Sequence, residues 1–208
     1  MITLFDYGSG NAESVYNAIR RVSDQVERSS DAKSLRTSSA VVIPGVGSFS
    51  AFMDALGKLG VIESLQSSLS KGLPCLGICV GMQALAEWGH ENGKNRGLAV
   101  MRGEVEHLHS LGVQHKRVPH VGWNGIRLAH TVSANHPLRV IEDRDVYFMH
   151  SYALGASTNP AIAWTDYEVE FCSVIEKEHV LGVQFHPEKS QSAGLDFLDA
   201  WIRSVHSP

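Results

Sequence analysis

The sequence predicts an α/β fold of three layers, with a mostly parallel central sheet that gains antiparallel strands in the second half of the chain. Over residues 1–95, short apolar runs alternate with amphipathic stretches, and the turns between them are short and rich in glycine. The runs are apolar throughout, as is typical of strands that a parallel sheet buries on both faces. Over residues 98–184, strand-like runs are separated by turn clusters, which favours antiparallel pairing.

In the first half, strands and helices are expected to follow one another in order. Residues 2–5 form an apolar run that ends at a glycine-rich turn, and Asn11 is a suitable cap for the helix that follows. Helical spacing predicts one buried face for this helix: Val15, Ala18, Ile19 and Val22. The same reasoning predicts further strands at 40–43 and 74–78, and helical stretches at 49–56, 61–69 and 82–88.

The second half is expected to add strands and then a closing helix. The expected strands lie at 125–128, 146–149, 162–164, 171–175 and 180–184. Apolar residues at helical spacing predict a terminal helix within 190–205: Leu195, Leu198, Trp201, Ile202 and Val205. The chain carries no internal repeat, low-complexity tract or linker, so residues 1–208 are expected to form one domain.

Composition and charge exclude several classes of protein. Hydrophobic residues make up 43% and charged residues 19% of the chain, which is a normal globular balance. The net charge of −4 provides no basic field, so no nucleic-acid partner is expected. No apolar run approaches the length of a membrane span, and the first residues lack the features of a secretory signal. Three cysteines do not make a disulfide framework, which predicts a reducing, cytoplasmic location.

The most informative segment is Gly77-Ile78-Cys79-Val80-Gly81, in which two glycines flank a cysteine at the end of a buried strand. This is the pattern of a nucleophile elbow, whose sharp turn leaves no room for neighbouring side chains and exposes the nucleophile above the sheet. The helix expected to follow would bring free N–H groups and partial positive charge to the sulfur, and the N–H of Val80 could receive an oxyanion. Taken alone, the segment is equally compatible with a buried structural cysteine. Cys75 and Cys172 are expected in the core.

The second informative segment is His186-Pro187-Glu188. Proline keeps the residue before it extended, and residues two apart in an extended chain point the same way, so the carboxylate could accept the imidazole N–H. Taken alone, the simpler interpretation is a surface histidine beside a turn. A cysteine nucleophile, however, needs a base from elsewhere in the fold, and the carboxyl ends of parallel strands meet at one edge of a sheet. The two segments together therefore predict a Cys79–His186–Glu188 triad.

A third strand ends at Pro44-Gly45-Val46-Gly47, where glycines allow a close approach of backbone to a ligand. An N–H of Val46 or Gly47 could complete an oxyanion hole with Val80. The alternative, a phosphate-binding loop, lacks the third glycine and the lysine that such loops need. The eleven histidines show no recognisable ligand spacing, so no metal site and no cofactor are expected.

Three stretches of the chain resemble, in this order, the motifs of the class I, triad-type glutamine amidotransferases. They are Pro-Gly-Val-Gly, Gly-Ile-Cys-Val-Gly-Met-Gln and Phe-His-Pro-Glu. Four further stretches resemble the glutaminase subunits of imidazole glycerol phosphate synthase, which act in histidine biosynthesis; these stretches are 6–11, 119–124, 147–152 and 188–190. The resemblance covers essentially the whole chain. The sequence departs from the family at Ala12-Glu13 and at Val80, where the family more often has other residues. Val80 keeps its backbone N–H, so it can still serve the oxyanion hole.

The resemblance implies a flavodoxin-like amidotransferase fold and a role for each matched residue. Cys79 would attack the side-chain amide of L-glutamine, His186 would protonate the leaving ammonia, and water would then hydrolyse a glutamyl thioester. Glu188 would orient His186. Val80 and the Val46–Gly47 loop would hold the oxyanion, and the residues implied to bind substrate are Gly45, Gln83, Ser151 and Tyr152.

The resemblance also implies a partner. Ammonia would pass to a cyclase subunit, a (β/α)₈ barrel, which makes imidazole glycerol phosphate and an aminoimidazole carboxamide ribotide. The two subunits would form a heterodimer, and the positions matched to the subunit interface are Asn11, Trp123, Tyr147 and Lys189.

Three alternatives remain open at the level of sequence. The chain could feed ammonia to a different acceptor, such as a sugar-modifying synthase. It could be a non-catalytic subunit whose oxyanion hole never forms. It could also be a cysteine-dependent peptidase or chaperone-like hydrolase on a similar sheet, which release of ammonia from glutamine would argue against.

Overall fold

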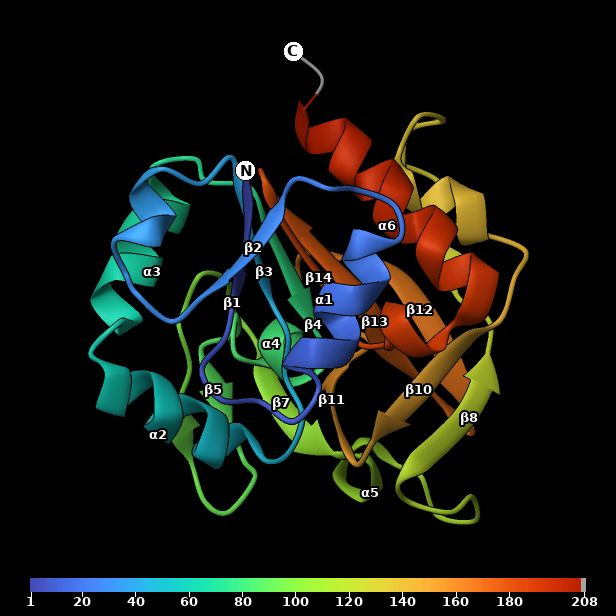
Figure 1. Ribbon diagram of the computed structural model, residues 1–208. Helices are drawn as coiled ribbons and strands as arrows, with labels where there is room; N and C mark the ends of the chain where they lie inside the picture. Colours follow the sequence, from blue (N-terminus) through green and yellow to red (C-terminus); the bar gives the residue numbers. More distant parts are fainter. Residues whose placement is uncertain (207–208) are drawn as a thin grey trace.

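The computed structural model describes residues 1–206, in which a parallel block of strands forms the centre of the main sheet (Figure 1). The strand order in this block is β2-β1-β3-β4-β14, and every neighbouring pair is parallel. All but β2 are fully buried, as strands between two layers of helices must be. Their bounds are β1 Ile2–Phe5, β2 Val26–Ser29, β3 Ala40–Ile43, β4 Cys75–Ile78 and β14 Val180–Val183.

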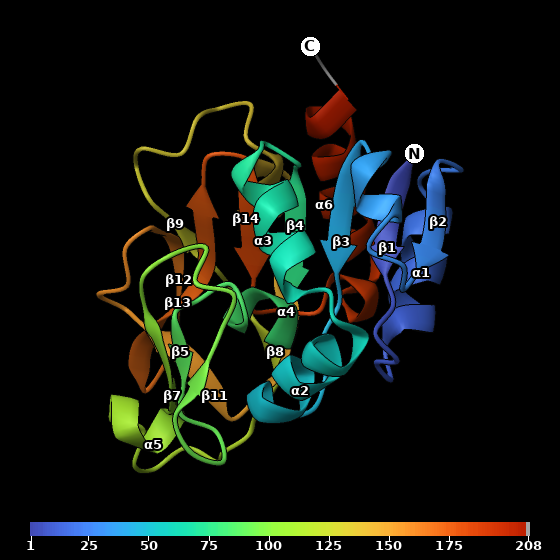
Figure 2. The ribbon, with the colours of Figure 1, turned by 90° about the vertical axis from the view of Figure 1, so that its left-hand side faces the viewer.

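Helices cover both faces of this block, which gives the three layers that the sequence predicts. Helices α2 (Phe49–Leu59) and α3 (Ile62–Ser70) lie on the face turned toward the viewer in Figure 2, and α1 (Ala12–Arg20) and α6 (Gln191–His206) lie behind it. Each buries an apolar stripe against the sheet, for example Phe49, Phe52 and Leu56 of α2. None of the helices within residues 1–206 is long and apolar enough to span a membrane.

Beyond β14 the sheet continues with mostly antiparallel strands, as predicted. β13 (Val169–Lys177) pairs antiparallel with β14, with β11 (Tyr152–Gly155) and with β12 (Ala161–Tyr167). The sheet continues through β7 (Glu104–His107), β5 (Trp88–Gly89) and β6 (Asn95–Arg96), and β9 (Arg127–Leu128) pairs with β12. The remaining short helices are α4 (Val80–Gln83), α5 (Leu108–Leu111) and the 3-10 turns η1 (Ser34–Arg36), η2 (Pro137–Ile141) and η3 (Pro187–Lys189).

Two strands form a sheet of their own, β8 (His120–Asn124) and β10 (Val146–His150), which pair antiparallel. The expectation that every strand of the second half joins the central sheet is therefore wrong for β10. The strand expected at 125–128 is only partly correct, because β8 ends at Asn124 and the next strand begins at Arg127.

Two further expectations differ from the structure. The predicted helix at 82–88 ends at Gln83, and the segment continues into a strand at Trp88–Gly89. The physical reason is that the carbonyls of Ala84 and Leu85 accept N–H groups from residues 98–101 instead of continuing a helix. The edge strand β2 has no counterpart in the prediction, because three of its four residues are polar and only Val26 is buried.

The parallel register brings three chain segments to one edge of the sheet. Val183 of β14 lies beside Ile78 of β4, and Ile43 of β3 lies beside Gly77. The segments that follow these strands, which begin at Pro44, Cys79 and Gln184, therefore leave the sheet at the same edge. Ligands of open α/β sheets bind at this edge.

Candidate active site

Cys79 occupies a strained turn between β4 and α4. Its φ of 54° and ψ of −109° lie in a region that residues with a side chain rarely adopt. A Cβ on Gly81 would lie 2.0 Å from the carbonyl oxygen of Ile43, and one on Gly77 would lie 2.8 Å from that of Gly81. Both predicted glycines are therefore needed sterically, because the turn is packed against the end of β3.

His186 and Glu188 form a buried pair just beyond β14. The Nδ1 of His186 lies 2.8 Å from Oε1 of Glu188, and neither side chain is exposed. His186 is extended, as the proline predicts, but Glu188 lies in the 3-10 turn η3 rather than in extended chain. The turn, not strand alternation, brings the carboxylate to the imidazole.

Asn11 completes this pair. Its Nδ2 donates to Oε1 of Glu188 over 3.1 Å, and only 4% of the residue is exposed. The expected side-chain cap of α1 is absent, and the Oδ1 of Asn11, the atom that would accept a helix N–H, accepts instead from the Ser9 hydroxyl over 3.2 Å. Asn11 is also not displayed on the surface, where an interface residue would lie. Inside the chain, Asn11 binds the carboxylate that is paired with His186.

The pKa values of the pair reflect their burial and their partners. Burial alone lowers the pKa of His186, but the nearby Cys79 sulfur, and then the hydrogen-bonded Glu188 carboxylate, raise it to about 10. Burial alone raises the pKa of Glu188, yet its hydrogen bonds and charge interaction with His186, together with Asn11, hold it below the usual value. The other ring nitrogen of His186, Nε2, is buried without a hydrogen-bond partner among residues 1–206. That nitrogen is free to exchange a proton with a reacting group.

A cavity of about 220 Å³ opens at Cys79. It gathers residues that the sequence places far apart, and those predicted to act here are Val46, Gly47, Cys79, Val80, Gln83, Ser151 and Tyr152. Gly45 does not line the cavity, and neither do the buried side chains of His186 and Glu188. A Cβ at Gly45 would lie 2.5 Å from the N of Gly81, so this glycine lets the loop after β3 pack against the nucleophile turn.

The cavity also contains residues that the sequence did not single out: Glu91, Pro119, Met149 and His150. Glu91 is its one acidic lining residue within the described chain, and its Oε2 accepts the N–H of Phe49, the first residue of α2, over 2.8 Å. No local pattern marks Glu91, because it stands in a polar turn after β5. His150 lies in the 147–152 stretch, so its motif was visible but its place in the cavity was not.

The side-chain amide of Gln83 donates two hydrogen bonds inside the protein, close to the site. Its Nε2 donates to the carbonyl of Tyr152 over 2.8 Å and to Oε1 of Gln184 over 3.0 Å. Gln184 in turn donates from its Nε2 to the sulfur of Cys79 over 3.6 Å. Both amide hydrogens of Gln83 are thus used within the protein, and only its oxygen is available to a ligand.

The strands β8 and β10 lie side by side (Figure 1), and together they carry partly exposed aromatic side chains. Trp123 is 45% exposed and its ring lies 5.8 Å from that of its cross-strand neighbour Tyr147. The Nζ of Lys189 lies 5.9 Å from the ring centre of Tyr147, and Val121, 53% exposed, adds to this face. Three of the four predicted interface residues therefore lie together.

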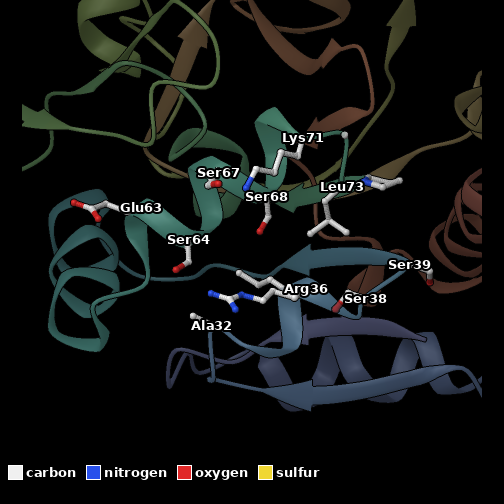
Figure 3. A pocket seen from close by; sticks show the side chains of 13 residues that line it. Ala32, Arg36, Ser38, Ser39, Glu63, Ser64, Ser67, Ser68, Lys71 and Leu73 are labelled. Carbon is white, nitrogen blue, oxygen red and sulfur yellow. The ribbon is translucent and has the colours of Figure 1, made fainter.

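A larger cavity, about 720 Å³, lies elsewhere (Figure 3). Its lining includes Ser39 and Pro74, which directly precede β3 and β4, so it lies at the opposite edge of the sheet. Arg36 and Lys71 contribute the basic groups of its lining. None of the predicted site residues lies in it, whereas seven of them line the smaller cavity at Cys79.

Two buried histidines, His120 and His150, should make the stability of the protein depend on pH. Burial lowers the pKa of His120 to about 4, helped by the charge of Lys116, and lowers that of His150 to about 3, helped by His120. In the unfolded chain both return to about 6.5. Between these values the unfolded state binds more protons, so the free energy of unfolding falls as the pH falls, by up to about 1.4 kcal/mol per pH unit for each histidine.

We therefore expect urea unfolding to require less denaturant at pH 5 than at pH 7. His120→Asn, which removes one titrating group, should make this slope shallower. A free energy of unfolding that is constant over this range would contradict the prediction. The window lies above the pKa of ordinary carboxyl groups, so acid titration of Asp and Glu does not confuse it.

Comparison with known proteins places the chain among amidotransferases. The family model for class I glutamine amidotransferases matches residues 3–201. Curated relatives include imidazole glycerol phosphate synthase subunits HisH of Lactococcus lactis (37% identical, 98% of both chains), Caldanaerobacter subterraneus (40%, 95% of both) and Methanothermobacter thermautotrophicus (38%, 100% of both).

Two solved structures share the fold at low identity. One is a crystal structure of a glutamine amidotransferase, with a TM-score of 0.70 at 15% identity over 96% of this chain and 98% of the other. The other is the PurLQS structure from Thermotoga maritima, with a TM-score of 0.70 at 13% identity over 98% and 97%. These agree with the three-layer arrangement described above.

Proposed function

This chain belongs to the class I glutamine amidotransferases and, among them, to the HisH subunits of imidazole glycerol phosphate synthase. From that premise we propose which step of the reaction each site residue carries out. It hydrolyses L-glutamine to L-glutamate and ammonia as the glutaminase subunit of that synthase, in histidine biosynthesis. One observation carries the proposal: the strained Cys79 turn and the buried His186–Glu188 pair follow neighbouring parallel strands and act on one another electrostatically.

In the first half-reaction, Nε2 of His186 takes the thiol proton of Cys79, and the sulfur attacks the side-chain amide carbon of glutamine. A C–S bond forms and the carbonyl electron pair moves onto the oxygen, which accepts hydrogen bonds from the N–H of Val80 and one N–H of the Val46–Gly47 loop. When the C–N bond breaks, Nε2 of His186 gives its proton to the leaving nitrogen, and ammonia departs from a glutamyl thioester.

In the second half-reaction, Nε2 of His186 takes a proton from water as the water oxygen attacks the thioester carbon. The C–S bond then breaks, which releases glutamate and restores the sulfur. Glu188, held by Asn11, accepts the Nδ1 hydrogen of His186 and stabilises the imidazolium in both steps. No metal or cofactor takes part in this scheme.

Glutamine recognition falls to the remaining lining residues. We assign the α-ammonium group of the substrate to Glu91, because a cation in this cavity needs a carboxylate and Glu91 supplies the one acidic group among the described lining residues. Ser151 and Tyr152 also line the cavity, and the oxygen of Gln83 remains for a donor on the substrate.

Glu91→Gln tests the substrate assignment. The amide oxygen can still accept the N–H of Phe49, so the contact that steadies α2 remains while the negative charge is lost. A charged hydrogen bond contributes about 1.5–3 kcal/mol, so KM for glutamine should rise about 10- to 100-fold with kcat changed far less. Steady-state glutaminase kinetics measure this.

The matched control is Glu104→Gln, which removes a charge from the neighbouring strand β7, where Glu104 is paired with Lys94 and His90 outside the cavity. It should leave KM unchanged. If Glu91→Gln also leaves KM unchanged, Glu91 only supports α2 and the α-ammonium group binds elsewhere.

We propose further that a cyclase subunit docks on the face formed by Val121, Trp123, Tyr147 and Lys189, making a heterodimer. Exposed aromatic side chains with a flanking cation are typical of the centre of a protein interface. The same proposal treats residues 1–208 as one glutaminase domain. A cytoplasmic location is part of it, because all three cysteines are unpaired thiols.

Ammonia transfer tests the function and the partner together. The two subunits are co-purified and supplied with amide-¹⁵N glutamine and the cyclase substrate. We expect faster glutamine hydrolysis than in the free chain, and ¹⁵N in the imidazole product. Trp123→Ala should weaken the complex and reduce the stimulation. Equal turnover with and without the cyclase would identify a stand-alone hydrolase, and release of label only as free ammonia would indicate another acceptor.

A further inference from the structure

The paired histidines of β8 and β10 connect the strand pair to the cavity. His120 and His150 form the last residue pair of this two-stranded sheet, and they are only 3% and 5% exposed. Nδ1 of His120 lies 3.1 Å from Nε2 of His150, and Nδ1 of His150 lies 3.0 Å from the carbonyl oxygen of Tyr152. His150 and Tyr152 both line the cavity at Cys79.

The carbonyl decides where the hydrogens are. A carbonyl oxygen only accepts, so His150 carries its hydrogen on Nδ1 and donates it to Tyr152. In the neutral ring, Nε2 of His150 is then an acceptor, and it accepts the Nδ1 hydrogen of His120. The ring of His120 is held in place by stacking at 3.9 Å on Tyr167 and at 4.9 Å on Phe148. The Tyr152 carbonyl therefore fixes the tautomer of His150, and His120 donates to the ring nitrogen that this tautomer leaves without a hydrogen.

From Tyr152 the hydrogen bonds continue to the nucleophile. The carbonyl of Tyr152 also accepts from Gln83, Gln83 donates to Gln184, and Gln184 donates to the sulfur of Cys79. His150 and Gln83 both donate to the Tyr152 carbonyl, and each bond has a fixed donor, so reversing any ring or amide leaves a buried polar group unpaired. The chain runs from β8, whose outward side chains form the exposed face, to the reacting atom.

We infer that His120 and His150 are positioning residues of the glutaminase reaction, which rests on the proposed function: through the Tyr152 carbonyl, Gln83 and Gln184 they hold the Cys79 sulfur in place for attack. His120 touches neither the cavity nor the sulfur, so its effect travels through the hydrogen bonds. Because the assigned recognition of the α-ammonium group lies at Glu91, loss of the network lowers kcat more than it raises KM.

Two amide substitutions at His120 separate the effect of its hydrogen bond to His150 from the effect of losing the imidazole ring. His120→Asn places an N–H near the position of Nδ1, within reach of His150, whereas His120→Gln places the same amide near the position of Nε2, turned away from it. Glutaminase kinetics are measured for both in the complex with the cyclase subunit. We expect His120→Asn to retain kcat within about twofold and His120→Gln to lose about tenfold, with KM within threefold in both.

Wild-type activity separates failure of this inference from failure of the proposed function. An inactive wild-type complex overturns both. If the wild-type complex is active and both variants have the wild-type rate, only the inference is overturned. The same holds if both variants are equally impaired, because the position of the amide then has no effect. If neither variant folds, ¹⁵N NMR of histidine-labelled wild-type protein decides: a hydrogen on Nδ1 of His150 supports the inference, and a hydrogen on Nε2 overturns it.

Discussion

Cys79→Ala is expected to abolish glutamine hydrolysis while the fold remains. The sulfur forms the covalent bond to substrate, and losing a covalent nucleophile costs several orders of magnitude in rate. Alanine fits the site because the side chain only becomes smaller, and the strained backbone at φ 54° is held by the packing of Gly77 and Gly81. Ammonia release, measured in the presence of the cyclase subunit, should fall below about 1% of wild type.

The control is Cys75→Ala, the same substitution at the buried opposite end of β4, outside the cavity. It should remain active. A second readout follows from the pKa of His186: because Cys79 contributes most to raising it, the pKa should fall in Cys79→Ala, which NMR titration measures. Residual hydrolysis above about 1% would show that another group attacks the amide, and the triad assignment would then be wrong.

Gly81→Ala should both destabilise the protein and stop the reaction. The added methyl group would lie 2.0 Å from the carbonyl oxygen of Ile43, so the nucleophile turn and the end of β3 must move apart. Backbone cannot yield as a flexible side chain would, and overpacking of this kind costs about 3 kcal/mol. The same movement displaces Val80 from the oxyanion, so kcat should fall at least about 100-fold. Urea unfolding and glutaminase assays measure the two effects.

Gly57→Ala is the matched control, because a Cβ there meets nothing closer than 4.0 Å and the residue lies inside α2. Alanine should stabilise this helix by up to about 1 kcal/mol and leave kcat unchanged. If Gly81→Ala behaves like Gly57→Ala, the close approach of the turn to β3 is not a requirement of the site.

Much of the fold was predictable because its strands and helices follow from local patterns of apolar residues. Continuous apolar runs marked β1, β3 and β4, and helical spacing marked α2, α3 and α6. The errors lie where long-range contacts override a local preference. Residues 84–85 have helical character, but their carbonyl oxygens accept hydrogen bonds from N–H groups of residues 98–101. Strand β2 is polar because it lies at an edge of the sheet.

The candidate site divides in the same way. The turn at Cys79 and the His186–Glu188 pair could be predicted, because each is built within a few residues and each has a steric or hydrogen-bonding reason visible in the sequence. Glu91 and Gln184 could not be predicted as members. Glu91 reaches α2 from 42 positions away, and Gln184 reaches Cys79 from 105 positions away, and no local pattern encodes either contact.

The amino-acid sequence by itself therefore determined the reactive groups and the sharp turns that carry them, since these depend on neighbouring residues and on backbone sterics. Only the tertiary structure decided which groups support them: that Asn11 is buried on Glu188, and that hydrogen bonds connect β8 to the Cys79 sulfur through the Tyr152 carbonyl. The reason is that strand order and register bring distant residues together, and burial makes each such polar contact obligatory once it is formed.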